Sequence, residues 1–367
     1  MAKQQSYALN AEPVRMAVFA PVLALFVYFI PIPAWVVDDW YSRDMYPWFQ
    51  NIVTTVTNVL PLAVIDLLLV LTAVLTLHRT WRLFHVMRQR GVIDAIWEGA
   101  RRVVRFVSVV AVLFYWSWGF NYRRLPLDNV LPAGTPPRVT MDMLQTGFAD
   151  AASLASRLRP VVQNDAGNLY SIKLDLKDPM NEALRILQRT PLETPAVPKY
   201  SLILSPFFTW SGVTGMTNPF GLETIMLPDL LPFERPFVLA HEWAHLAGHG
   251  DEAEASAVGW LACMKAGPVS AYSASLYLIS EAAAAMPAEA RETAMARLDG
   301  GVKADLDAIE NRMRQQRPAV RRASARVYDQ YLRANRVEDG NASYGRALKL
   351  ILAAPFKDAL GTYTVSR

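Results

Sequence analysis

Cysteine is almost missing from this chain, since Cys263 is the single one in 367 residues. One cysteine excludes an intramolecular disulfide and a metal site built from several thiolates. Any metal ion would therefore have to be held by histidine and carboxylate side chains. Histidine is scarce too, with five in the chain, so the position of each is informative. Cys263 itself lies in an apolar run, WLACMKA, and is predicted to be a buried core thiol.

Charged residues are also few, at 19% of the sequence, whereas hydrophobic residues make up 52%. This composition is too apolar for one ordinary soluble domain and too charged for a chain that lies wholly in lipid. The long apolar runs lie before about residue 120, and the remainder mixes apolar and charged residues as a soluble domain does. We therefore expect an apolar N-terminal region followed by a folded domain.

The net charge of +4 and the pI near 9.1 raise the question of nucleic-acid binding. A nucleic-acid surface spreads its basic residues over a face with interleaved aromatic side chains. Here the arginines gather in one short stretch between two apolar runs. We therefore expect no nucleic-acid partner, and we attribute the basic stretch to the way the chain crosses a lipid bilayer.

Three apolar runs are long enough to cross a bilayer as helices. They cover about residues 16–37, 59–77 and 103–120. Pro31 and Pro33 fall near the far end of the first run, where the helix is expected to break. The sequence thus predicts three transmembrane helices in a membrane anchor over residues 1–121, then a proline-rich linker at 122–139.

Two features concern the boundary of the bilayer. Aromatic residues of the kind enriched at a lipid–water interface follow the first run. They are Trp35, Trp40, Tyr41, Tyr46 and Trp48.

Asp66 lies inside the second run, and a carboxylate within a membrane is by default a functional candidate. Because no basic partner is visible at matching depth in the other runs, we interpret Asp66 as lying at the bilayer edge or bonding to a neighbouring helix.

The loops between the runs differ in charge and so predict orientation. The first loop holds Asp38, Asp39, Asp44 and Arg43, and the second holds Arg79, Arg82, Arg88, Arg90, Arg101 and Arg102. Basic loops stay in the cytoplasm. We therefore expect a multi-pass protein of the cytoplasmic (inner) membrane with a cytoplasmic N-terminus and an extracytoplasmic domain after Phe120. Arg123 and Arg124 oppose this orientation but are outnumbered.

Residues 140–367 are expected to form a mostly helical α+β domain. The pattern of apolar residues predicts helices around 141–158 and 179–189, a strand-like run at 200–204, and a glycine-rich turn region at 211–221. Most of the remainder reads as helix. The fold class predicted for the whole chain is therefore three transmembrane helices plus this domain.

The segment PFVLAHEWAHLAGHG contains the pattern HExxH at His241, Glu242 and His245. On a helix, residues four apart lie on one face, so both imidazoles can reach one Zn2+ ion. Glu242, one residue after His241, can then contact the water molecule bound to that ion. A chance match is expected in on the order of one chain in a few hundred with so few histidines. The apolar run before the pattern and Gly248 after it are what an active helix of this kind needs.

The chain resembles a bacterial family of membrane-anchored HExxH proteins with three N-terminal spans, catalogued mainly as a domain of unknown function and zincin-like in its C-terminal half. The segments that carry the resemblance are WSWGFNYRRLPL, SGVTGMTNPFGLE, HEWAHLAGHGDEAEASAVGWLAC and YDQYLRANRVEDGNASYGRALKLIL. They cover most of residues 116–352. The family typically has asparagine where this chain has Ser256. The resemblance implies a zincin-like fold and peptidase chemistry, without a known substrate.

The third metal ligand is not fixed by the motif. The candidates are Asp251, Glu252, Glu254 and His249. The extended pattern HExxHxxGxxD favours Asp251, whereas Glu252 with Ser256 four positions on resembles the arrangement in zincins whose third ligand is glutamate. Glu254 would point about 200° away from Glu252 around the helix axis. We predict Glu252 as the ligand beside His241 and His245, with Asp251 and Glu254 as alternatives.

Two further features each allow two interpretations. The glycines of SGVTGMTNPFGLE either let an edge strand approach the active helix and pair with substrate, or form a plain turn cluster. They are Gly212, Gly215 and Gly221. Tyr331 and Tyr344 look like family positions and either stabilise an oxyanion through a hydroxyl or are core tyrosines.

The sequence therefore predicts a membrane-anchored zinc metallopeptidase that cleaves peptide or protein at the cell envelope, with Zn2+ as cofactor and Glu242 as general base. One alternative is a non-catalytic sensor or scaffold that retains the fold, although such a protein has no use for Glu242. Another is an amidohydrolase that acts on a cell-envelope amide.

Overall fold

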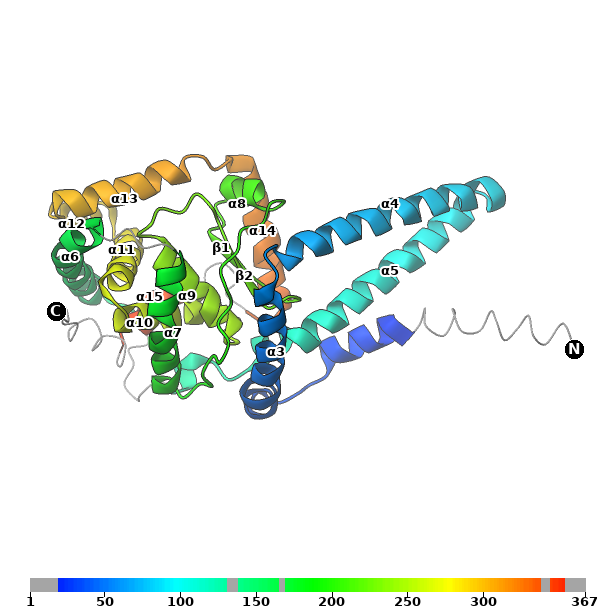
Figure 1. Cartoon of the computed structure of the whole chain (residues 1–367), viewed down its shortest axis with the longest axis horizontal. Coiled ribbons are helices and arrows are strands. Elements are labelled where there is room, and N and C mark those ends of the chain that lie inside the picture. The colour runs from blue at the N-terminus through cyan, green and yellow to red at the C-terminus, as the bar shows by residue number, and fades with distance from the viewer. Residues whose placement is uncertain (1–18, 131–137, 165–168, 338–343, 354–367) are drawn as a thin grey trace, which may run out of the picture.

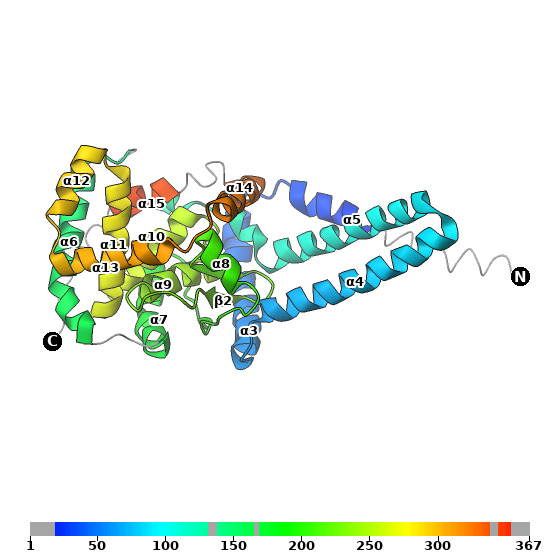
Figure 2. The same ribbon diagram turned by 90° about the horizontal axis from the view of Figure 1, so that it is seen from above.

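A computed structural model describes residues 19–130, 138–164, 169–337 and 344–353. These residues are mostly helical, as expected. The strands among them are β1 (Gly215–Asn218) and β2 (Glu223–Met226), which pair in antiparallel register from Gly215 opposite Met226 to Asn218 opposite Glu223. The chain forms a domain from which an arm of long helices projects (Figures 1 and 2).

The arm is a hairpin of α4 (Val64–Arg90) and α5 (Val92–Ser117). Gly91 alone connects them, and its φ of 93° is a conformation that glycine adopts without strain. The helix Phe19–Phe29 points the same way from the domain (Figure 1). Among the described residues, α4 is the helix that is by itself long and apolar enough to cross a membrane.

The first predicted run is bent. Its helix Phe19–Phe29 stops before the prolines, and helical structure resumes as α2 (Ala34–Val36), η1 (Val37–Met45) and α3 (Tyr46–Val59). The two parts meet at 105° and pass the length and apolarity test for a membrane span only as a bent pair. Pro31 and Pro33 explain the break, because proline cannot donate the backbone hydrogen bond that continues a helix. Residues 16–18 of the predicted span lie outside the described residues.

The other helices build the domain around α10 (Glu252–Lys265), in which every residue from Glu252 to Met264 is buried. A helix that is covered all round has to lie at the centre of its fold. Around it pack α7 (Leu169–Ile186), α9 (Arg235–Leu246), α11 (Pro268–Ala285) and α15 (Tyr344–Ile351). The remaining helices are η2 (Gly119–Arg123), η3 (Leu127–Val130), α6 (Met141–Asn164), α8 (Ser205–Ser211), α12 (Ala288–Ala296), α13 (Gly300–Met313) and α14 (Pro318–Ala334).

The prediction of a strand at 200–204 was wrong. These residues form turns that lead into α8. The carboxylate of Asp66, in the first turn of α4, accepts the amide of Leu202 at 2.8 Å and the hydroxyl of Ser201, so it fixes the turn. Asp66 therefore lies at the domain end of α4, and its partner is a loop and not the neighbouring helix that we considered. Its position relative to the bilayer edge stays a prediction. The glycine-rich region at 211–221 contains β1.

Candidate metal centre

The helix α9 presents both histidines of the motif on one face. Pro236 occupies its first turn, where a missing N–H costs nothing, and Gly248 follows its end with a φ of 88°. The opposite face, which includes Leu239 and Trp243, is fully buried. Packing on that side fixes the rotation of the helix and hence the direction of the imidazoles.

The structure brings His241, His245 and Glu252 together. The Nε2 atoms of the two histidines are 3.1 Å apart, and carboxylate oxygens of Glu252 lie 3.3 Å from His241 Nε2 and 3.6 Å from His245 Nε2. Ligand atoms 2.0–2.1 Å from a tetrahedral zinc ion are separated by roughly 3.3 Å from one another. The three side chains therefore have the spacing and the chemistry of a zinc donor set.

Both imidazoles have a polar partner at Nδ1, the ring nitrogen that does not face the other ligands. The Nδ1 of His245 donates to the carbonyl oxygen of His249 at 2.6 Å, and the Oγ of Ser256 lies 3.2 Å from His241 Nδ1. A partner at Nδ1 fixes the ring and leaves the Nε2 lone pair for a metal ion. Ser256 thus has the supporting position that the sequence predicted for it beside Glu252.

The charges within this cluster are strongly coupled. Burial raises the pKa of Glu252, but the adjacent His245 and His241 outweigh it and hold that pKa well below its usual range. Burial lowers the pKa of His245, and the charge of Glu252 reverses this and raises it to about 9. The cluster therefore combines a buried carboxylate with two imidazoles beside it, and the negative charge of Glu252 favours a cation at this position.

Glu242 lies against β1. Its Oε2 accepts the hydroxyl of Thr217 at 3.0 Å, and its main-chain oxygen accepts the same hydroxyl at 2.8 Å. A Cβ on Gly215 would stand 2.7 Å from Glu242 Oε1, so a side chain at this position would displace the carboxyl group of Glu242. Burial raises the pKa of Glu242 despite the two nearby histidines. A carboxyl group with a raised pKa is suited to exchange protons.

The other ligand candidates point elsewhere. Glu254 accepts the amide of Leu127 at 2.6 Å and lies 3.1 Å from His249 Nδ1, on the far side of α10 from Glu252. Asp251 caps α10 by accepting the amide of Ala253 at 2.9 Å. Burial lowers the pKa of His249 to about 4.

Sequence analysis missed Tyr328. Its hydroxyl donates to Oε1 of Glu252, so α14 reaches the candidate metal site. Tyr331, one turn further, is 3.3 Å from the hydroxyl of Tyr122, and the side chain of Tyr344 lies outside the described part of the structure. The spacing YDQY places Tyr328 on the same face as Tyr331, which is the signal that could have identified it.

Side chains from the N-terminal region cap the end of α9. The last carbonyl groups of a helix lack partners within it. Here Trp118 donates to the oxygen of His245 at 3.0 Å and Tyr46 to that of Leu246 at 2.7 Å. Arg124 donates to the oxygen of Gly248, in the segment after the helix, at 3.1 Å. Local sequence patterns gave no indication of these contacts. The predicted anchor and the helix that carries the HExxH motif therefore pack against each other.

Asp38 binds the capping residue Arg124 together with two other arginines. Its Oδ1 accepts from Arg189 at 2.7 Å and from Arg124 at 3.2 Å, and its other oxygen accepts from Arg43 at 3.1 Å. Asp38 is 1% exposed. Burial raises the pKa of this carboxyl, but the surrounding guanidinium groups outweigh it and lower the pKa below its usual value.

A family model described as "Protein of unknown function (DUF3810)" matches residues 41–352. The match includes the candidate metal ligands and the capping residues Tyr46, Trp118 and Arg124, and it begins after Asp38. No curated protein and no solved structure matches the chain.

Proposed function

Because the chain belongs to the DUF3810 family of proteins of unknown function, its activity has to be argued from the site, and we propose that it is a membrane-anchored zinc metallopeptidase. The observation that carries this proposal is the convergence of His241, His245 and Glu252, with Glu242 one residue along the same helix. A purely structural metal site needs no buried carboxylate beside its ligands.

His241, His245 and Glu252 would hold the ion. When bound, zinc supplies Lewis acidity, which makes water a competent nucleophile near neutral pH. Glu242 takes the proton from the attacking water and returns it to the leaving amine, and its desolvated carboxyl group is suited to both steps. Thr217 fixes the direction of that carboxyl group, and Tyr328 fixes that of Glu252.

The substrate would be an extended peptide. β1 pairs with β2 on one side and lies against α9, and its residues Gly215 to Thr217 are only partly buried. A peptide that adds to the free edge of such a strand gains main-chain hydrogen bonds. The close approach at Gly215 would then place a peptide carbonyl near Glu242.

The identity of the third ligand gives the first test. We expect Glu252→Gln to weaken zinc binding by roughly 100-fold or more, because it removes a charged ligand, whereas Glu254→Gln should keep its zinc. Zinc per protein would be measured by mass spectrometry on the purified full-length proteins, with circular dichroism as a check of fold. Normal zinc content in the Glu252 variant together with loss in the Glu254 variant would assign the role to Glu254.

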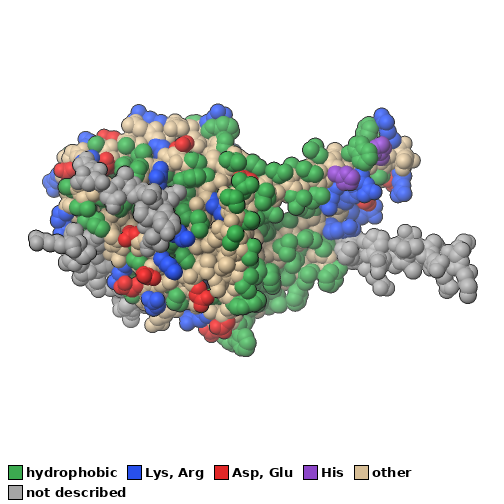
Figure 3. Space-filling model, viewed as in Figure 1, with side chains coloured by type: hydrophobic (Ala, Val, Ile, Leu, Met, Phe, Trp, Pro, Cys, Tyr) green, Lys and Arg blue, Asp and Glu red, His purple; other side chains and the backbone are tan. Residues whose placement is uncertain are grey.

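We further propose that α4, α5 and the helix Phe19–Phe29 are the three spans of a cytoplasmic-membrane anchor, with the domain on the extracytoplasmic side. Basic side chains gather at the far tip of the hairpin, as Figure 3 shows. Arg123 and Arg124 do not oppose this orientation, because both are buried and bound within the protein. Arg123 caps the helix Phe19–Phe29 by donating to the oxygen of Tyr28 at 2.7 Å.

Reporter fusions test the orientation. A reporter joined after residue 130 should be active only if it is a type that functions after export, because the basic hairpin tip between α4 and α5 is retained in the cytoplasm. The same pair of reporters inserted after Arg90 should give the reverse pattern. Activity of a cytoplasm-dependent reporter at residue 130 would overturn the orientation.

A further inference from the structure

The helix α3 is amphipathic, but its polar side faces the domain and its apolar side faces outward. The side that faces the domain is largely polar and buried, and its side chains bond to the domain's main chain. Gln50 donates to the oxygen of Thr194 at 2.8 Å, and Thr54 donates to that of Leu222 at 2.7 Å. A helix at a protein–water boundary shows the opposite arrangement, with its apolar side inward.

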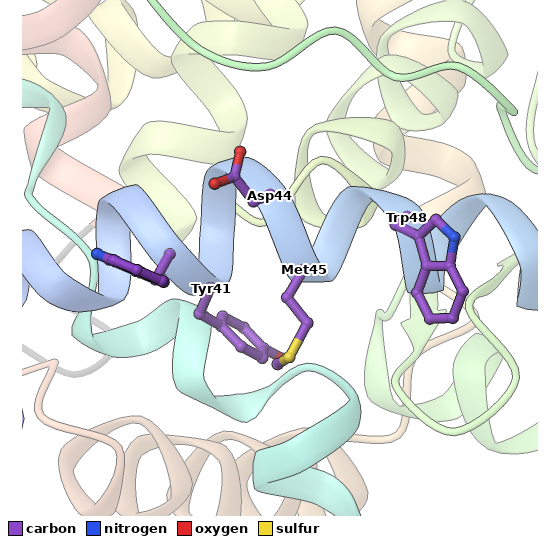
Figure 4. A pocket seen from close by; sticks show the side chains of 5 residues that line it. Tyr41, Asp44, Met45 and Trp48 are labelled. Atoms are coloured by element: carbon purple, nitrogen blue, oxygen red, sulfur yellow. The ribbon is translucent and has the colours of Figure 1, made fainter.

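The outward side of this helix is apolar and exposed. Its residues recur at helical spacing, and Val59 is 80% exposed. The set is Met45, Trp48, Ile52, Val56 and Val59. In Figure 4, Met45 and Trp48 lie on the side of the helix opposite to Asp44. A hollow of about 490 Å³ opens here, lined by Trp40, Tyr41, Asp44, Met45 and Trp48.

A second exposed apolar segment lies at the base of the arm. In the turn before α8, Leu202 is 78% exposed and Ile203 is also exposed, as is Phe207 in α8 itself. Asp66 binds the main chain of this turn, so the segment is fixed to the start of α4. Figure 3 shows hydrophobic side chains continuing from this edge of the domain onto the arm.

The position of α3 beside the start of α4 places it at the surface of the proposed membrane. α4 is by itself long and apolar enough to cross a bilayer, and it begins at Val64, shortly after α3 ends at Val59. α3 lies across the direction of the arm (Figure 1). A helix that lies along a membrane surface buries its apolar face by about 5–10 Å in the interface. With α4 inserted in lipid, the outward face of α3 would therefore lie at this depth.

We infer that the outward face of α3 and the Leu202 turn are immersed in the outer part of the lipid bilayer, so that the catalytic domain rests on the membrane and is not merely tethered to it. The hollow beside Trp48 then takes lipid acyl groups. This inference rests on the proposed membrane anchorage and is independent of the proposed peptidase activity.

Spin labels on single cysteines test the immersion in the full-length protein. Labels would replace Ile52, Val56 and Leu202, with Leu71 of α4 as a lipid reference and Arg314, which follows α13, as a water reference; native Cys263 is fully buried. In liposomes of phosphatidylcholine and phosphatidylglycerol, the ratio of accessibility to oxygen over accessibility to a water-soluble nickel chelate would be measured. The three test positions should match Leu71 and lie far above Arg314.

Three outcomes would overturn the inference, and they differ in what they leave standing. If the test positions resemble Arg314 while Leu71 remains in lipid, the surface faces water and the anchorage stands. If the test labels are shielded from both reagents and their spin–spin broadening disappears on dilution with unlabelled protein, a second copy covers the face. If Leu71 itself is accessible to nickel, the proposed anchorage fails as well.

Discussion

Replacing Glu242 with glutamine is expected to slow peptide hydrolysis by roughly 10²–10⁴-fold while zinc stays bound. Glutamine has nearly the same size and can still accept the hydroxyl of Thr217, so the environment of the ligands is preserved. It cannot take a proton from water, and so the proposed general base is lost. His241→Ala and His245→Ala should instead lose the metal. Turnover of a peptide substrate and zinc content would be measured on the same preparations.

A matched substitution shows whether the effect is specific. Glu193→Gln makes the same chemical change at an exposed carboxylate that pairs only with Asn51 among the described contacts. It should leave both turnover and zinc content unchanged. Wild-type hydrolysis by the Glu242→Gln protein would remove the proposed mechanism, and loss of zinc in that protein would show that Glu242 acts on the metal and not on water.

Asp38→Ala should destabilise the protein by roughly 3–5 kcal/mol, which is the usual result of removing one partner from a buried ion pair. It leaves Arg124 and Arg189 as buried guanidinium groups without their shared carboxylate. Arg124 also caps the main chain after α9, so zinc affinity should fall together with stability. The midpoint of thermal unfolding in detergent and the zinc content would be followed together.

The next residue provides the control. The side chain of Asp39 is 58% exposed and lies 3.6 Å from Arg43 in a surface pair. Such pairs contribute about 0–1 kcal/mol, so Asp39→Ala should hardly move the unfolding midpoint. Equal midpoints for the two variants would mean that the Asp38 network does not stabilise the fold.

The pairing of His241 with His245 could be predicted from local helix geometry, whereas the choice of Glu252, which lies on the next helix, rested on the resemblance to zincins with a glutamate ligand. The two histidines are one helical turn apart, and the angle between successive residues on α10 separated Glu252 from Glu254. Tyr328 was missed because it reaches the site from a helix 76 positions away. Nothing in the spacing of its neighbours indicates which surface α14 covers.

The long apolar helices and the helical domain follow from hydrophobic pattern, but two details did not. The run at 200–204 looked like a strand because it is apolar, yet its amides bond to Asp66 of a distant helix. Asp38 looked like one of several acidic residues that set membrane orientation. In the structure its burial makes it a centre of packing, which depends on contacts with Arg124 and Arg189 far along the chain.

The capping of α9 by Tyr46, Trp118 and Arg124 has a consequence for how such a protein can be released. All three precede the active helix in the sequence, so they leave the ribosome before it and are available when it folds. A cut in the chain between Leu127 and Met141 could free a fragment that retains every metal ligand. That fragment would have left behind the groups that complete its active helix. Under the proposed function and anchorage, shedding from the membrane would therefore inactivate the protein instead of producing a diffusible enzyme.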